Sequence, residues 1–189
     1  MTDTIFKIIQ TLTNGFKIYK ESKKNLHENF LKPAMTDFEK VHENYIESYK
    51  NYSRLLGEST DPFDKNHPVF QMIKEDALFS MNIREKVYSF YDYTNDEIFS
   101  DFIISIMNYF KYSTESANFN NQLDYEMEMC RNSIRTDTYH GLIFIMESNS
   151  ISNKKSRAIK QTKMAVKNLQ DRYRKVIDNY NALKIELLN

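Results

Sequence analysis

Apolar side chains recur mainly at three- and four-residue steps through the first 56 residues, which is the repeat of an amphipathic helix. The residues on this stripe are Ile5, Ile9, Leu12, Phe16, Tyr19, Leu26, Phe30, Ala34, Phe38, Val41, Tyr45, Tyr52 and Leu55. Successive four-residue steps run from Leu26 to Phe38, and Pro33 lies within them. Because proline removes a helical hydrogen bond and clashes with the preceding turn, we predict one long helix over 1–56 with a kink near Pro33.

The last predicted helix, 152–189, carries the most regular stripe in the chain. Its seam is made of Ile159, Thr162, Val166, Leu169, Tyr173, Val176, Tyr180, Leu183 and Leu187. Such a seam is typical of a coiled coil formed with the first helix, a second copy or another protein, and it also fits one side of an ordinary bundle helix. The residues that we predict to contact a partner are Ile159, Val166, Leu169, Tyr173, Val176, Tyr180 and Leu183.

Between these helices the pattern predicts a loop over 57–68 and a small helical head over 69–148. Thr94 and Glu97 have the spacing of a capping box, and the stretch 98–110 that follows is the most hydrophobic in the chain, so we place the centre of the core there. Only three glycines and three prolines interrupt the helical repeat. The predicted fold class is therefore all-α: an elongated helical bundle in which long, coiled-coil-like N- and C-terminal helices form one continuous domain, joined to the head.

Charge is distributed unevenly although the chain has a net charge of zero. Residues 57–148 hold seven basic and sixteen acidic side chains, whereas residues 149–189 hold ten basic and three acidic ones. A basic final helix of this kind can be neutralised by the acidic central helices, or it can bind an acidic protein or a nucleic acid. The possible polyanion-binding residues are Lys160, Lys163, Lys167 and Arg174.

Metal and nucleophile signatures are weak in this sequence. Glu39 and His42 form a Glu-x-x-His on a helix, but a carboxylate di-metal site needs a second such pair, which the chain lacks. No phosphate-binding loop and no serine or cysteine nucleophile with an evident base occurs, so we predict no metal and no cofactor. The single cysteine, Cys130, fits a reducing compartment. Because the chain has neither a signal peptide nor a membrane-length apolar stretch, we expect a soluble, cytoplasmic protein.

One short motif suggests a catalytic alternative. Arg135 is followed after four residues by His140 and then by Gly141. This spacing resembles the Arg-x(4–6)-His signature of the HEPN superfamily, a group of all-helical domains that often act as dimeric, metal-independent ribonucleases in toxin–antitoxin and phage-defence systems. The resemblance implies that His140 is a general acid or base and that Arg135 stabilises phosphate charge. The non-catalytic interpretation of the same stretch is a polar, kinked segment that packs locally.

The predicted helix over 1–56 is longer than the one over 152–189. On the order of ten to fifteen residues of its seam would then lack a partner within the chain. We therefore predict a non-enzymatic interaction or adaptor subunit that dimerises or docks on a larger complex through its long amphipathic helices. The expected partner is a protein or a second copy, with nucleic acid possible through the basic helix and no membrane. The alternative function is a HEPN-like ribonuclease or toxin that uses Arg135 and His140.

Overall fold

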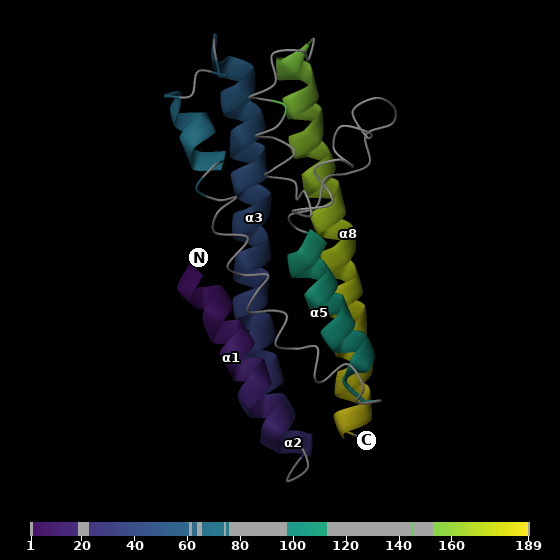
Figure 1. Ribbon diagram of the computed structural model, residues 1–189. Coiled ribbons are helices and arrows are strands. Elements are labelled where there is room, and N and C mark those ends of the chain that lie inside the picture. The colour runs from purple at the N-terminus through teal and green to yellow at the C-terminus, as the bar shows by residue number, and fades with distance from the viewer. Residues whose placement is uncertain are drawn as a thin grey trace, which may run out of the picture. The chain divides into compact units, whose positions relative to one another are not determined.

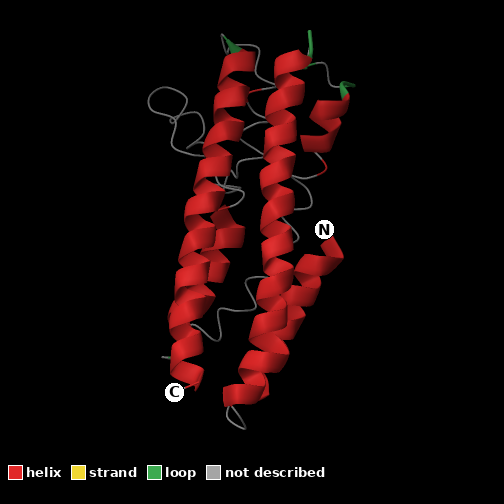
Figure 2. Ribbon diagram, turned by 180° about the vertical axis from the view of Figure 1, so that it is seen from behind, coloured by secondary structure: helices red, strands yellow, loops and turns green. Residues whose placement is uncertain are grey.

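A computed structural model describes residues 2–18, 23–60, 62, 63, 66–73, 75, 98–112, 145 and 153–188. Every regular secondary-structure element within these residues is a helix, so the all-α class is confirmed (Figures 1 and 2). The elements are α1 (Thr2–Ile18), α2 (Lys23–Leu26), the π-helical turn η1 (His27–Leu31), α3 (Lys32–Glu58), α5 (Ser100–Tyr112) and α8 (Lys154–Leu188). In the described part of the chain, no helix combines the length and the apolar character needed to cross a membrane.

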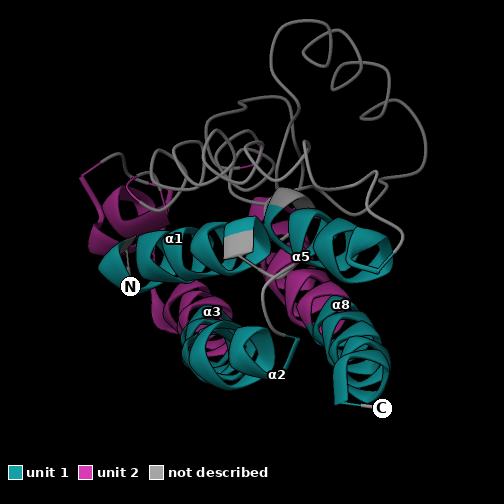
Figure 3. Ribbon diagram, turned by 90° about the horizontal axis from the view of Figure 1, so that it is seen from below, with its two compact units in different colours: residues 1–45, 82–110, 170–189 teal, residues 46–81, 111–169 magenta. Residues whose placement is uncertain are grey.

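The chain divides into two compact units, which Figure 3 distinguishes by colour. Unit 1 contains residues 1–45, 82–110 and 170–189, and unit 2 contains residues 46–81 and 111–169. Both α3 and α8 contribute residues to each unit. The central segment 69–148, predicted as a separate head, is likewise shared between the units, because the segment that includes α5 belongs to unit 1.

The prediction of a single helix over 1–56 is wrong. Instead, α1 ends at Ile18, and it packs against α2 and η1, which a continuous rod could not do. The physical reason is that the apolar face of α1 packs against other segments of the same chain: Ile5, Ile8 and Leu12 are all buried, and so is Phe16. The expected excess of unpaired seam in the first helix therefore does not exist.

Helix continues through Pro33, and the irregularity precedes it. In η1 the backbone N–H of Lys32 donates to the carbonyl of His27, which is the five-residue hydrogen bond of a π-helix. This wider turn accommodates the four-residue apolar steps from Leu26 to Phe38, so that both of these side chains lie on the buried face and are fully buried. The predicted disturbance near Pro33 is thus a π-helical turn, from which α3 runs on to Glu58.

Gly15 allows α1 to approach η1 closely. A Cβ atom at this position would lie 2.7 Å from the Cβ of Phe30 and 2.9 Å from Cδ1 of Leu26. By contrast, a Cβ at Gly57 in α3 would meet no atom within 4 Å.

We expect these two glycines to respond oppositely to alanine. Gly57→Ala should raise the free energy of unfolding by up to about 1 kcal/mol, because alanine is the better helix former. Gly15→Ala should lower it by about 1–3 kcal/mol, since overpacking outweighs the same gain in helix propensity. Chemical denaturation followed by circular dichroism measures both effects. A stabilising Gly15→Ala substitution would show that α1 does not pack against η1 this closely.

The core of unit 1 is built around α5. Its buried face and the residue that precedes it comprise Phe99, Phe102, Ile103, Ile106, Tyr109 and Phe110, which confirms the prediction of a buried helix within 98–110. Ring contacts connect this face to α1 through Phe16 and Phe99, with centroids 4.9 Å apart, and to α8 through Phe102 and Tyr180, at 6.2 Å. The predicted capping box at Thr94 and Glu97 lies outside the described residues.

Unit 2 joins the end of α3 to the beginning of α8. Its buried apolar residues are Tyr49, Tyr52, Leu56, Val69, Phe70, Ile73, Ile145, Ala158, Ala165 and Leu169. The Nζ of Lys155 donates to the backbone carbonyl of Ser59 at 2.9 Å, and the Nζ of Lys154 lies 5.7 Å from the ring centroid of Phe63. These contacts fix the first turn of α8 against the segment that follows α3.

Candidate functional site on the C-terminal helix

The structure divides the predicted partner-binding seam of α8 into closed and partly open positions. Leu169, Val176 and Leu183 are buried by the chain itself, with exposed fractions of 1%, 0% and 3%. Ile159 and Val166 in unit 2, and Tyr173 and Tyr180 in unit 1, are half-buried. The alternation arises because alternate seam residues face the centre of each core and the others lie at its margin. Only the marginal residues can contact a partner without unfolding the chain.

Tyr173 belongs to an aromatic cluster in unit 1. Its ring stacks on His42, with centroids 4.0 Å apart and an interplanar angle of 4°, and it also stacks on Phe38 at 5.9 Å. The Nδ1 of His42 shares a hydrogen bond of 3.0 Å with the hydroxyl of Tyr109. Burial lowers the pKa of His42 to about 4, and burial raises the pKa of Tyr109 well above its usual value. His42 is therefore a neutral packing residue at neutral pH.

A second histidine forms a relay of hydrogen bonds. The Nδ1 of His27 lies 3.0 Å from a carboxylate oxygen of Glu28, and its Nε2 lies 3.1 Å from the hydroxyl of Tyr180. Hydrogen bonds with Lys32 and with His27 lower the pKa of Glu28, so its carboxylate accepts from Nδ1–H, and a neutral ring accepts the proton of Tyr180 at Nε2.

This relay has the atom order of a carboxylate–histidine–hydroxyl triad, but its environment is unsuitable for catalysis. The side chain of His27 is only 3% exposed, so a substrate cannot reach the ring. Burial also raises the pKa of Tyr180, which keeps its hydroxyl protonated. The relay consequently serves to fasten η1 to α8.

Ser59 and His67 form a hydroxyl–imidazole pair in unit 2. The Nε2 of His67 lies 2.9 Å from Oγ of Ser59, and the backbone N–H of Val69 donates to Nδ1 at 3.2 Å. Because Nδ1 accepts this hydrogen bond, the proton of a neutral ring is on Nε2 and is donated to Ser59. The imidazole therefore cannot remove the hydroxyl proton, and the pair stabilises the loop instead of activating a nucleophile.

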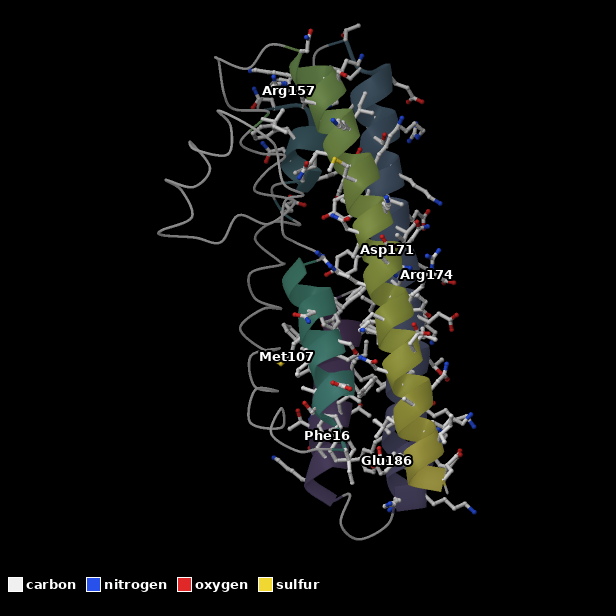
Figure 4. All side chains as sticks on the ribbon, turned by 90° about the vertical axis from the view of Figure 1, so that its right-hand side faces the viewer. Phe16, Met107, Arg157, Asp171, Arg174 and Glu186 are labelled. Atoms are coloured by element: carbon white, nitrogen blue, oxygen red, sulfur yellow. The ribbon has the colours of Figure 1, made fainter. Side chains whose placement is uncertain are left out.

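The basic residues of α8 differ in how far they are engaged by the chain. Lys160, Lys163 and Lys167 are exposed and, within the described residues, form no ion pair. Arg174 is also exposed, but its guanidinium lies 3.6 Å from the carboxylate of Asp171, and the two residues lie close together on α8 in Figure 4. The predicted polyanion-binding set is thus brought to the surface, with Arg174 partly neutralised.

An exposed apolar patch occupies the last turns of α8 and was not predicted. It consists of Ala182, Ile185 and Leu188; Ile185 is 62% exposed and Leu188 is 46% exposed. Residues three apart on a helix are neighbours, so the three side chains are contiguous. The available sequence signal was the occurrence of large apolar residues off the seam that contains Leu183 and Leu187.

Several predicted sites lie beyond the described residues. These are Arg135 and His140 of the HEPN-like motif, and Cys130. Among the residues that the structure does describe, no group of three histidine, cysteine, aspartate or glutamate side chains is placed to hold a metal ion. Comparison with family models, with curated proteins and with solved structures finds no match to this chain.

Proposed function

We propose that this chain is a non-enzymatic helical interaction subunit and that the apolar patch Ala182, Ile185 and Leu188 is its docking surface. The observation that carries the proposal is the exposure of Ile185, which at 62% exceeds that of every other exposed large apolar side chain in the described residues. Isolated exposed apolar residues are common in soluble proteins, but contiguous ones indicate a contact surface.

The surroundings of the patch support a protein contact. Lys184 and Glu186, both exposed, alternate with the apolar residues. An apolar centre with a polar margin is the usual composition of a protein–protein interface.

The histidine chemistry of the described residues also favours a non-enzymatic function. His27 and His42 are buried, and His67 is held by Ser59 and by the N–H of Val69 in the tautomer that cannot activate the serine. From the predicted coiled-coil-like contact of 152–189, the proposal keeps only the half-buried seam residues and the last turns of α8. The ribonuclease alternative depends on Arg135 and His140 and stays a prediction.

We expect the double substitution Ile185→Glu and Leu188→Glu to weaken self-association, or binding of a helical partner, at least tenfold. Burying an aliphatic side chain contributes about 1.5–3 kcal/mol, and a carboxylate in its place would have to be desolvated. Sedimentation equilibrium measures self-association. Affinity capture from the native source, followed by mass spectrometry, identifies a partner protein.

The matched control is Ile104→Glu, which changes an exposed isoleucine of α5 that is 41% exposed. This variant should associate like the wild type. A wild-type chain that stays monomeric at high concentration and retains no partner protein on purification would contradict the proposal. Equal loss of binding in the Ile104 variant would show that the patch on α8 is not the docking surface.

A further inference from the structure

Three lysines form a straight row along the unit 2 part of α8. Lys160, Lys163 and Lys167, named here the lysine row, are separated by three and four residues, so they lie on one side of the helix. All three are exposed. No acidic residue occurs between Lys154 and Gln170 in the sequence; the nearest acidic residue of α8 is Asp171, four residues after Lys167, and its carboxylate pairs with Arg174.

Contacts within the chain engage three other cations of the same helix. Lys154 lies over the ring of Phe63, and Lys155 donates to the carbonyl of Ser59. Arg174 pairs with Asp171. Within the described residues, the lysine row forms no ion pair and no cation–π contact, and its three side chains are exposed.

The composition of the row identifies the kind of ligand. Lysine is depleted at protein–protein interfaces, whereas it is a principal contact to the phosphates of nucleic acids. Residues 154–169 contain no aromatic side chain, and binding of single strands relies on aromatic rings that stack on bases. We propose that the lysine row binds the phosphate backbone of double-stranded DNA, without reading its sequence.

The dimensions of the row suit this ligand. From Lys160 to Lys167 the helix advances about 10 Å, at roughly 1.5 Å per residue. Duplex DNA presents one phosphate charge for about every 1.7 Å of its axis, so each lysine can meet a different phosphate. Because lysine contacts of this kind specify no base, the affinity should be independent of sequence. The row and the apolar patch share no residue, and this inference does not depend on the proposed function.

Salt dependence provides the test. Neutralising three phosphates gives a slope of about −2.7 for log K against log salt, so the affinity for a fluorescein-labelled DNA duplex should fall about fortyfold between 50 and 200 mM salt. In the triple variant K160Q/K163Q/K167Q, binding at 50 mM salt should be much weaker, and the binding that remains should have a slope close to zero. Fluorescence anisotropy measures the affinity, and circular dichroism verifies that the variant is folded.

The control variant K17Q/K24Q/K50Q changes net charge equally but removes exposed lysines that do not form a row. It should keep the wild-type slope. An equal fall in both variants, or unchanged binding by the row variant, would overturn the inference. Preference for an RNA duplex over the DNA duplex would also overturn it. Tighter binding of polyglutamate than of DNA would do the same and would indicate an acidic protein as the ligand.

Discussion

Phe38→Ala is expected to lower the free energy of unfolding by about 3–5 kcal/mol, the usual range for removing a buried phenylalanine side chain. Phe38 on α3 is fully buried. Its ring meets Tyr109 edge-on at 4.6 Å, Phe110 edge-on at 5.6 Å and Tyr173 in a stack at 5.9 Å. Alanine would leave a cavity among all three rings, and edge-on or stacked ring pairs contribute stability beyond that of the buried area alone.

Urea denaturation followed by circular dichroism measures this effect. Phe38→Leu should cost less than Phe38→Ala, because leucine fills most of the volume and loses mainly the ring contacts. The control is Ile104→Ala at an exposed position of α5, which should change stability by less than about 1 kcal/mol. If Phe38→Ala cost no more than this control, the ring cluster of unit 1 would not be packed as described.

Lowering the pH from 7 to 4 is expected to remove about 3 kcal/mol of stability through His42 alone. Burial lowers the pKa of His42 from 6.5 to about 4 in the folded protein. Between these two values the unfolded chain binds a proton at this histidine and the folded chain does not, so acid favours unfolding. The contribution of neutral His42 is intact above pH 6.5, decreases as the pH falls, and is lost completely below about pH 4.

The groups around His42 define the control for this experiment. Tyr173 stacks on its ring, and Tyr109 shares its hydrogen bond. The charges of Glu39 and Glu43 add to the burial that raises the pKa of Tyr173. The charge of Arg172 opposes the burial that raises the pKa of Tyr109. Hydrogen bonds to lysines lower the pKa values of Asp37 and Glu28, so acid also removes the stabilisation from these carboxylates.

His42→Asn leaves those carboxylates unchanged and places an amide near the position of Nδ1. Subtracting the unfolding free energy of this variant from that of the wild type therefore isolates the contribution of His42 to stability. The difference between the two proteins should shift by about 1.4 kcal/mol per pH unit between pH 6.5 and pH 4. Parallel stability curves for the two proteins would show that His42 is not held neutral by burial.

Much of the secondary structure was predictable from local spacing. The seam of 152–189 became α8, and the hydrophobic stretch 98–110 became the buried face of α5. The periodicity of the first 56 residues was real, since most of its apolar positions are buried. It could not show that α1 and α3 are separate helices, because a hairpin and a rod have the same apolar repeat. Nor could it show that Gly15 lies directly against Phe30 of η1.

The candidate sites were less predictable than the helices. His27 and Tyr180 are 153 residues apart in sequence, and His42 and Tyr109 are 67 residues apart. Neither pair can therefore be recognised from a short sequence motif. Ile185 and Leu188 lie off the predicted seam in the sequence, but their exposure is known only once the buried face of α8 is known. For the lysine row, the sequence left neutralisation by the acidic middle of the chain as an open alternative.

By itself, the amino-acid sequence determined the helical class, the seam of the last helix and the charge of its other faces. These properties follow from spacing and composition, which act over one or two helical turns. Tertiary structure alone decided which positions remain open: it buried Leu169, Val176 and Leu183, and it left Ile185 and Lys163 exposed. The physical reason is that burial depends on which distant segment covers a helix face, and a local repeat contains no information about that segment.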